Sequence, residues 1–158
     1  MPLSPEETYT VSQSPLFRML SGSAIGEITA LSTKIEVAAS TPLVVAGDHA
    51  EMLYVILDGI ATVQLPTPWG PHPEPVSAPY VCGWTGLLHP YRYLATVRTA
   101  TNCHLAAIPV PHLMTMIGRH DQTSALLLEQ LGRVALRRIE DIHALIEGRV
   151  AFNVEAGA

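Results

Sequence analysis

The stretch CGWTGLLHPYRYLATV, residues 82–97, decides the fold of this sequence. It opens with two glycines on either side of a bulky residue, Trp84, and continues into a pair of leucines. It closes on Ala95-Thr96-Val97 and carries one arginine among aromatic residues. Backbone N–H groups at a tight turn or helix start bind anions well. The layout therefore predicts a short loop or helix that cradles an anion between two strands.

The residues around this stretch predict a β-rich domain. From Ile35 to about Val110, short β-branched runs alternate with glycine and proline; the runs are PLVV, MLYVIL, IATVQL, YLATVRT and HLAAIPV. Many short strands at such spacing indicate a sandwich or barrel. The fold class predicted is mainly β with flanking helices, a double-stranded β-helix (jelly-roll) barrel followed by a long C-terminal helix. The proline-rich segment 66–79 is interpreted as a stiff loop.

The two ends of the chain give the remaining boundaries. Residues 1–14, rich in Ser, Pro and Glu, are interpreted as a flexible leader, and 15–147 as the domain. A helix is predicted over 123–147, with Gly148 as its C-cap and 148–158 as a tail. Its apolar stripe steps by three and four residues: Leu128, Leu131, Ala135, Ile139, Ile142 and Ile146. Near-heptad spacing favours a homodimer through this helix; the alternative is that the stripe packs only on its own domain.

Composition narrows the function classes. The formal net charge of −5 argues against a nonspecific nucleic-acid binder, although arginines gather late in the chain. Two cysteines, Cys82 and Cys103, are expected as buried free thiols. The N-terminus lacks a basic, apolar targeting pattern, and no apolar run reaches the roughly 18 residues of a membrane helix. A cytoplasmic protein without membrane attachment is expected.

The order of these elements resembles the cyclic-nucleotide-binding domain of the catabolite activator protein and its relatives, over about residues 15–147. The residues that carry the resemblance are Pro15-Leu16-Phe17, Gly47-Asp48 after PLVV, Tyr54, Ile56 and Gly59 in YVILDG, Gly83–Leu88 and Ala95-Thr96-Val97. The resemblance implies a cassette in which backbone N–H groups hold a cyclic phosphate, an arginine neutralises it, a glutamate accepts from the ribose hydroxyl and a Thr or Ser donates.

This sequence departs from that cassette at two polar positions. Trp84 stands at the position of the glutamate, and Tyr93 at that of the arginine, with Arg92 shifted by one residue. Such a shift in an extended segment turns a side chain to the other face. Gly83-Trp84-Thr85 and Pro90-Tyr91-Arg92 resemble a variant cassette of some family members. The candidate ligand-binding residues are Gly83, Trp84, Thr85, Gly86, Leu87, Arg92, Tyr93 and Thr96.

Several alternatives stay open for these residues. Trp84, Tyr91 and Tyr93 either stack on a planar ligand or fill the pocket themselves. Arg92 is either an anion anchor or a surface residue. No cofactor is specified, and the candidate ligand is a nucleotide-like or other anionic small molecule. The cassette is accordingly either retuned or vestigial.

Three hypotheses about function follow. The first is a non-enzymatic regulatory or sensor domain that binds cyclic AMP and cyclic GMP weakly or not at all. The second is a structural or adaptor protein with a self-plugged pocket and a protein partner. The third, a cupin-like metal enzyme, has little support because His49 and Glu51 lack the second histidine that a His-x-His ligand pair requires. Direct DNA binding is not expected, since 148–158 is too short for a helix-turn-helix unit.

Overall fold

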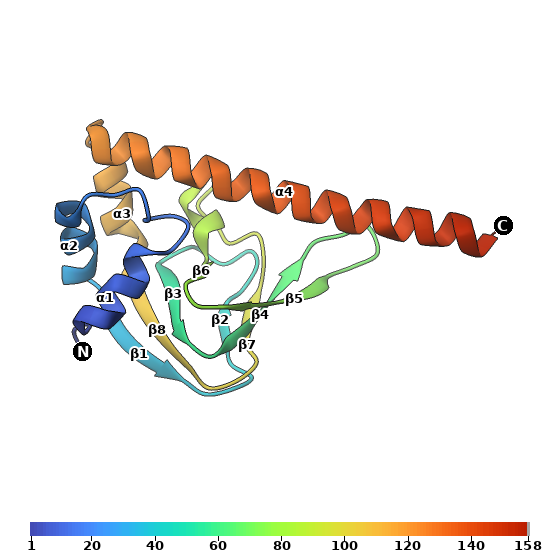
Figure 1. The fold of residues 1–158 in the computed structure, drawn as a ribbon, viewed down its shortest axis with the longest axis horizontal. Coiled ribbons are helices and arrows are strands. Elements are labelled where there is room, and N and C mark those ends of the chain that lie inside the picture. The colour runs from blue at the N-terminus through green and yellow to red at the C-terminus, as the bar shows by residue number, and fades with distance from the viewer. Residues whose placement is uncertain (158) are drawn as a thin grey trace.

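The computed structural model describes the backbone of residues 1–157 and the side chains of residues 1–148. Its strands form two four-stranded antiparallel sheets, ordered β1-β8-β3-β6 and β2-β7-β4-β5, which confirms the predicted jelly roll (Figure 1). The strands are β1 (Thr33–Val37), β2 (Pro42–Val44), β3 (Met52–Asp58), β4 (Ile60–Leu65), β5 (His72–Ser77), β6 (Val81–Cys82), β7 (Val97–Thr99) and β8 (Cys103–Pro109). The helices are α1 (Pro5–Ser12), α2 (Gly22–Ala30), η1 (Trp84–Leu87, a 3-10 turn), α3 (Val110–Ile117) and α4 (Gln122–Gly157).

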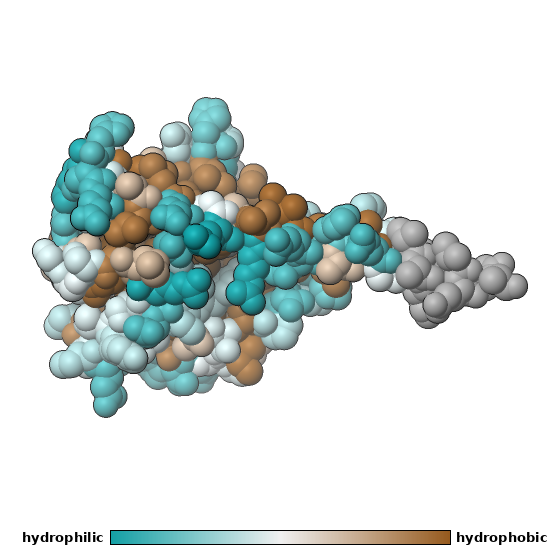
Figure 2. Space-filling view, turned by 45° about the horizontal axis from the view of Figure 1, so that its top comes forward, coloured by the Kyte–Doolittle hydropathy of each residue, from teal (hydrophilic) through white to brown (hydrophobic). Residues whose placement is uncertain are grey.

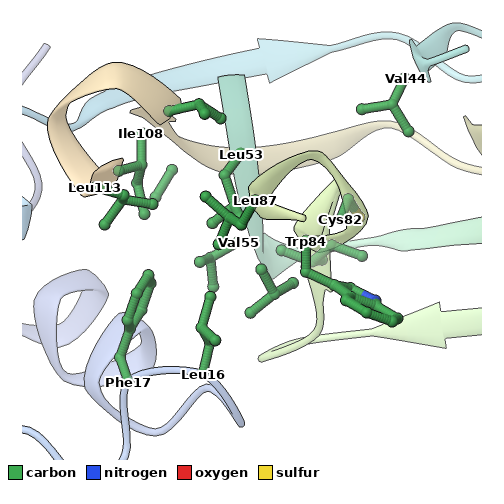
Figure 3. Packing of buried hydrophobic residues seen from close by; sticks show 14 of the residues in the cluster. Leu16, Phe17, Val44, Leu53, Val55, Cys82, Trp84, Leu87, Ile108 and Leu113 are labelled. Atoms are coloured by element: carbon green, nitrogen blue, oxygen red, sulfur yellow. The ribbon is translucent and has the colours of Figure 1, made fainter. Parts of the chain in front are cut away.

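The core lies between the sheets and continues under the N-terminal helices. Leu53 and Val55 of β3 are fully buried, as are Leu105 and Ile108 of β8. Figure 3 shows Leu16 and Phe17, from the segment between α1 and α2, pointing toward these strands. Because β8 is an inner strand covered by helices on its outer side, it is apolar on both faces, as a doubly covered strand must be. Both cysteines are free and buried, as predicted.

The turn between β3 and β4 explains why the YVILDG stretch needs its glycine. Gly59 has φ +96°, a left-handed conformation that side chains rarely adopt. A Cβ there would also collide with the carbonyl oxygen of Asn102 and lie 2.7 Å from the Cys103 sulfur. Only glycine fits this close approach of two backbone segments.

The flexible leader expected over residues 1–14 is wrong, because α1 orders it. Ser4 caps the helix: its hydroxyl accepts from the Glu7 N–H, and the Glu7 carboxylate accepts from the Ser4 N–H. Glu7 also pairs with Lys34 of β1 at 2.8 Å, and Val11 is completely buried. A capping box followed by one buried apolar residue was enough to fix a helix in a segment whose composition suggested a loose chain.

The proline-rich segment 66–79 is not a loop throughout, because it contains β5. Pro73 and Pro75 of β5 lie opposite Gln64 and Thr62 of β4. β5 is the edge strand of its sheet. Proline lacks an N–H and is tolerated at such an edge, where one row of backbone groups has no partner strand.

Helix α4 crosses one end of the sheets and continues past them (Figure 1). It runs from Gln122 to Gly157, so the predicted stop at Gly148 is wrong, and residues 149–157 of the predicted tail are helical. An internal glycine costs a helix only about 1 kcal/mol relative to alanine, which the flanking helical residues offset here. No helix in the part of the chain that the structure describes is long and apolar enough to span a membrane.

The predicted apolar stripe of α4 is divided between two faces. Leu131 is buried on the protein's own domain, together with Leu127. In contrast, Leu128 is 52% exposed and Ile139 is 64% exposed. The face that stays exposed follows positions three and four residues apart and comprises Ala125, Leu128, Gly132, Leu136 and Ile139. This outer face of α4 lies around the helix from the predicted stripe, because Leu131, Ala135 and Ile142 of that stripe pack against the barrel.

Candidate functional site

The cassette wall begins at Gly83, directly after β6. Gly83 has φ +87°, and a Cβ there would lie 3.0 Å from the Tyr93 ring and 3.3 Å from the Met52 carbonyl oxygen. The chain then turns through η1, from which Leu87 points into the core while Trp84 points to the other side (Figure 3). Gly83 thus reverses the chain in a left-handed conformation that side chains rarely adopt, and an added side chain would also have to displace the Tyr93 ring.

Tyr93 is a structural support for η1, because its ring and its hydroxyl are both engaged by the protein itself. It is 6% exposed, and its hydroxyl donates to the Met52 carbonyl at 2.5 Å while accepting from the Met52 N–H at 3.3 Å. A Cβ on Gly86 would collide with Ala50 and come within 3.4 Å of the Tyr93 ring. Burial raises the pKa of the Tyr93 phenol above its ordinary value. At the position of the family's arginine, this chain places a packing residue.

The Arg92 side chain lies on the surface and bonds to a neighbouring loop. Its guanidinium is exposed and donates to the Gly47 carbonyl at 3.0 Å. The Thr96 hydroxyl, expected to donate to a ligand, accepts from the Ala46 N–H at 3.0 Å. The Thr85 hydroxyl accepts from the Leu94 N–H at 3.1 Å. These polar groups bind the loops of the barrel to one another.

A cavity of about 250 Å³ lies between this cassette and α4. Gly83, Trp84 and Thr85 line its barrel side, whereas Gly86, Leu87, Arg92, Tyr93 and Thr96 lie outside its lining. The other barrel residues that line it are Val63, Leu65, Pro66, Tyr80, Leu88, Leu94, Ala95 and Val97. Helix α4 contributes Ala135, Arg138, Ile139 and Ile142. The structure therefore brings three of the eight predicted residues to one cavity, and it adds a wall from the helix.

Two residues at this cavity, Tyr80 and Arg138, were missed by sequence reasoning. The Arg138 guanidinium donates to the Tyr80 hydroxyl and lies 6.0 Å from the centre of the Tyr80 ring, a cation–π distance. Burial raises the pKa of Tyr80, and hydrogen bonds from Trp84 and Arg138 act in the opposite direction. The late cluster of arginines was visible in the sequence, but nothing indicated which of them would reach the barrel.

Metal chemistry finds no support in the described side chains. Among them, no three His, Cys, Asp or Glu groups gather around a common point. His49 forms an isolated β-bridge with Arg92, and Glu51 is exposed. The pair considered for a cupin-like centre is thus part of the loop that holds the cassette.

Comparison with known proteins agrees with this architecture. Residues 34–120 match the model of the family described as cyclic nucleotide-binding domain. No curated protein matches the sequence significantly. Among solved structures, a cyclic nucleotide-binding protein of Geobacter metallireducens GS-15 superposes with a TM-score of 0.72 at 17% identity, over 87% of this chain and 99% of that one.

Two further structures show the range of proteins that share this fold. The sensor domain of the transcriptional regulator DNR from Pseudomonas aeruginosa gives a TM-score of 0.66 at 18% identity, over 85% of this chain and 92% of that one. The regulatory domain of Toxoplasma gondii PKA with cAMP gives 0.62 at 22% identity over 70% of this chain, and the match spans only 42% of the Toxoplasma chain. At these identities the similarity demonstrates the fold.

Proposed function

Since this chain belongs to the cyclic nucleotide-binding domain family, we propose that it is a non-enzymatic sensor domain whose ligand cavity has been changed. The observation that carries the proposal is the cavity itself, with the cassette on one wall and α4 on the other. A molecule held there contacts both walls. Its binding therefore changes how firmly α4 lies on the barrel, and α4 transmits that change.

Weak or absent binding of cyclic AMP and cyclic GMP is part of this proposal. The positions of the glutamate and the arginine are taken by Trp84 and Tyr93, and Arg92 is bonded to Gly47 outside the cavity. The cavity volume of about 250 Å³ is also below the roughly 300 Å³ at which pockets for drug-sized ligands begin. A phosphate held by the cassette would lose the charged partner that the family's arginine supplies, which is worth roughly 1.5–3 kcal/mol; the one arginine among the described lining residues, Arg138, lies on α4 and not in the cassette.

Calorimetry with cyclic AMP and cyclic GMP tests this part. We expect no saturable heat at hundreds of micromolar nucleotide, whereas a Kd near 1 μM, about −8 kcal/mol, would contradict it. The converse variant is Trp84→Glu with Leu94→Arg, which restores an acid and a cation at two side chains that line the cavity. This pair leaves Tyr93 in place, because an arginine there would remove the support of η1. The double variant is expected to bind cyclic AMP more tightly than the original chain.

Pairing of two copies through α4 is the second part of the proposal. The outer face of α4 exposes Leu128, Leu136 and Ile139, each more than half accessible. Figure 2 shows apolar surface along the course of this helix. A long helix with an exposed apolar face is buried best against a second helix at a shallow crossing angle. The homodimer predicted from the sequence thus remains the proposal, with a different set of contact residues.

Sedimentation equilibrium tests the dimer. We expect twice the 17.0 kDa mass of the chain at tens of micromolar. Leu128→Glu with Leu136→Glu should give the monomer, because two buried carboxylates on each helix would repel and lose hydration, and neither residue lines the cavity. The control is Leu31→Glu, a leucine of similar exposure (51%) located after α2. A dimer that survives the double substitution would contradict the proposal.

The adaptor alternative has one observation in its favour, which is that Trp84 is only 6% exposed and fills part of the cassette. In that case no small molecule would bind, and the Trp84 ring would be a permanent plug. Release and mass spectrometry of small molecules from the purified protein separates this alternative from the sensor.

A further inference from the structure

The chemistry of the cavity is almost entirely apolar, with its polar groups gathered at one place. Its aliphatic and aromatic walls come from β4 and β7 of one sheet, from the residues on either side of β6, from η1 and the loop after it, and from α4. Among the side chains that the structure describes, no Asp, Glu or Lys lines it, and Arg138 is the only charged residue in the lining. A ligand of this cavity is therefore apolar over most of its surface and carries its polar group at the Arg138 end.

The Arg138 guanidinium has N–H groups that are available to a ligand at this position. Its side chain is half-buried, and it donates to the neutral hydroxyl of Tyr80. None of the ion pairs between described side chains includes Arg138. A guanidinium has five N–H donors and forms its strongest bonds, often in pairs, with carboxylates. A half-buried arginine without an acid beside an apolar cavity favours an anionic group on the ligand.

We propose that the cavity binds small amphipathic monocarboxylates, with the apolar body between Trp84 and α4 and the carboxylate on Arg138. This inference rests on the sensor function proposed above and names its ligand class. The cavity volume of about 250 Å³ corresponds to roughly eight groups of the size of a water molecule. A chain of medium length or a single aromatic ring fills it, and neither requires the position at which Tyr93 has replaced the family's arginine.

The neighbouring arginine provides a matched comparison. Arg137 is exposed on the same helix and lines an outer groove, together with Arg18 and Arg133; Tyr80 and Arg138 border both this groove and the cavity. It does not line the cavity under α4. Substitution of Arg137 thus removes the same charge from the same helix without changing the cavity.

The test uses octanoate, octan-1-ol and octylamine, three probes with similar bodies and different head groups. The background is Trp69→Phe, in which Trp84 is the only tryptophan and its fluorescence reports the cavity. Calorimetry on the unsubstituted chain gives the same affinities independently. We expect octanoate to bind at least tenfold more tightly than octan-1-ol and octylamine to bind weakest, because only the carboxylate forms charge-assisted bonds with the guanidinium.

Substitution then assigns the head group to Arg138. Arg138→Gln should weaken octanoate binding roughly tenfold or more and leave octan-1-ol unchanged, while Arg137→Gln changes neither. Circular dichroism and the melting temperature verify that both variants fold. If octan-1-ol or octylamine binds as tightly as octanoate, or if Arg138→Gln and Arg137→Gln act alike, the carboxylate assignment is overturned while the sensor proposal stands. If none of the three probes binds, the carboxylate assignment is overturned; if mass spectrometry also finds no small molecule released from the purified protein, the sensor proposal fails as well and the plugged adaptor is favoured.

Discussion

The barrel wall of the cavity is backed by tightly packed residues of the core, whereas the α4 wall is exposed to solvent on its outer side. On the barrel side, a Cβ at Gly86 would collide with Ala50, and Tyr93 is fixed by two hydrogen bonds to Met52. On the α4 side, Ile139 lines the cavity and is nevertheless 64% exposed.

The difference separates a fixed part of the site from an adjustable one. Close-packed interiors do not deform continuously, so the cassette wall keeps one shape with or without a ligand. Helix α4 is connected to the cassette side through the Tyr80–Arg138 hydrogen bond and the apolar lining. A helix that is held on one face can shift when the cavity fills, and this suits a sensor.

The largest contrast is expected between two glycines outside the lining, Gly86 behind the barrel wall and Gly132 on the outer face of α4. Gly86→Ala should lower the free energy of unfolding by about 1–3 kcal/mol, because the new methyl group overpacks the space beside Ala50. Gly132→Ala on α4 should raise it by about 0.5–1 kcal/mol, since nothing lies within 4 Å of the added Cβ and alanine favours helix. Urea denaturation measures both values. Two shifts of the same sign would show that the walls do not differ as described.

The fixed wall is also the part that could be predicted from the sequence. The turn glycine Gly59, the buried strand residues and the order of motifs from Gly47 to Val97 follow local rules of sterics and alternation, and the structure confirms the fold they predicted. The opposite orientation of Arg92 and Tyr93 could likewise be predicted, because neighbouring residues in an extended segment face opposite sides.

The adjustable wall was not predictable in the same way. Periodicity identified α4 and an apolar stripe, but it could not state which part of the stripe the barrel would bury. Leu131 packs inward and Ile139 stays exposed, because the docking angle of the helix is set by tertiary contacts. Arg138 reaches Tyr80 across 58 positions of sequence, and no local pattern encodes such a contact. The helix at α1 was missed for a different reason, since its polar composition concealed a capping box.

A smaller effect is expected when the support under the fixed wall loses one oxygen. Tyr93→Phe keeps the ring between Gly83 and Gly86 and removes the hydroxyl that bonds the Met52 backbone. The Met52 carbonyl then loses its donor in a half-buried place, which costs about 1–2 kcal/mol of unfolding free energy. Tyr9→Phe is the control, because Tyr9 is 66% exposed and should change stability by no more than about 0.5 kcal/mol. Equal effects of the two substitutions would remove Tyr93 from the role of a support.

The smallest effect is expected at the adjustable wall and depends on pH. Burial raises the pKa of Tyr80 above its ordinary value of 10.0. The neutral phenol is thus favoured while α4 covers it, and the covered state keeps its full stability below pH 10. As the pH rises past 10, a chain with α4 lifted loses the Tyr80 proton first, so the covered state loses stability relative to it. Hydrogen bonds from Trp84 and Arg138 offset part of the desolvation and keep the effect small.

A difference titration of tyrosinate absorbance against Tyr80→Phe measures this pKa. Arg138→Gln should raise it further, because a nearby cation stabilises the phenolate. Titration of Tyr80 at or below pH 10 in the unsubstituted chain would mean that α4 does not cover it in solution, and the comparison between the two walls would then need a different helix position.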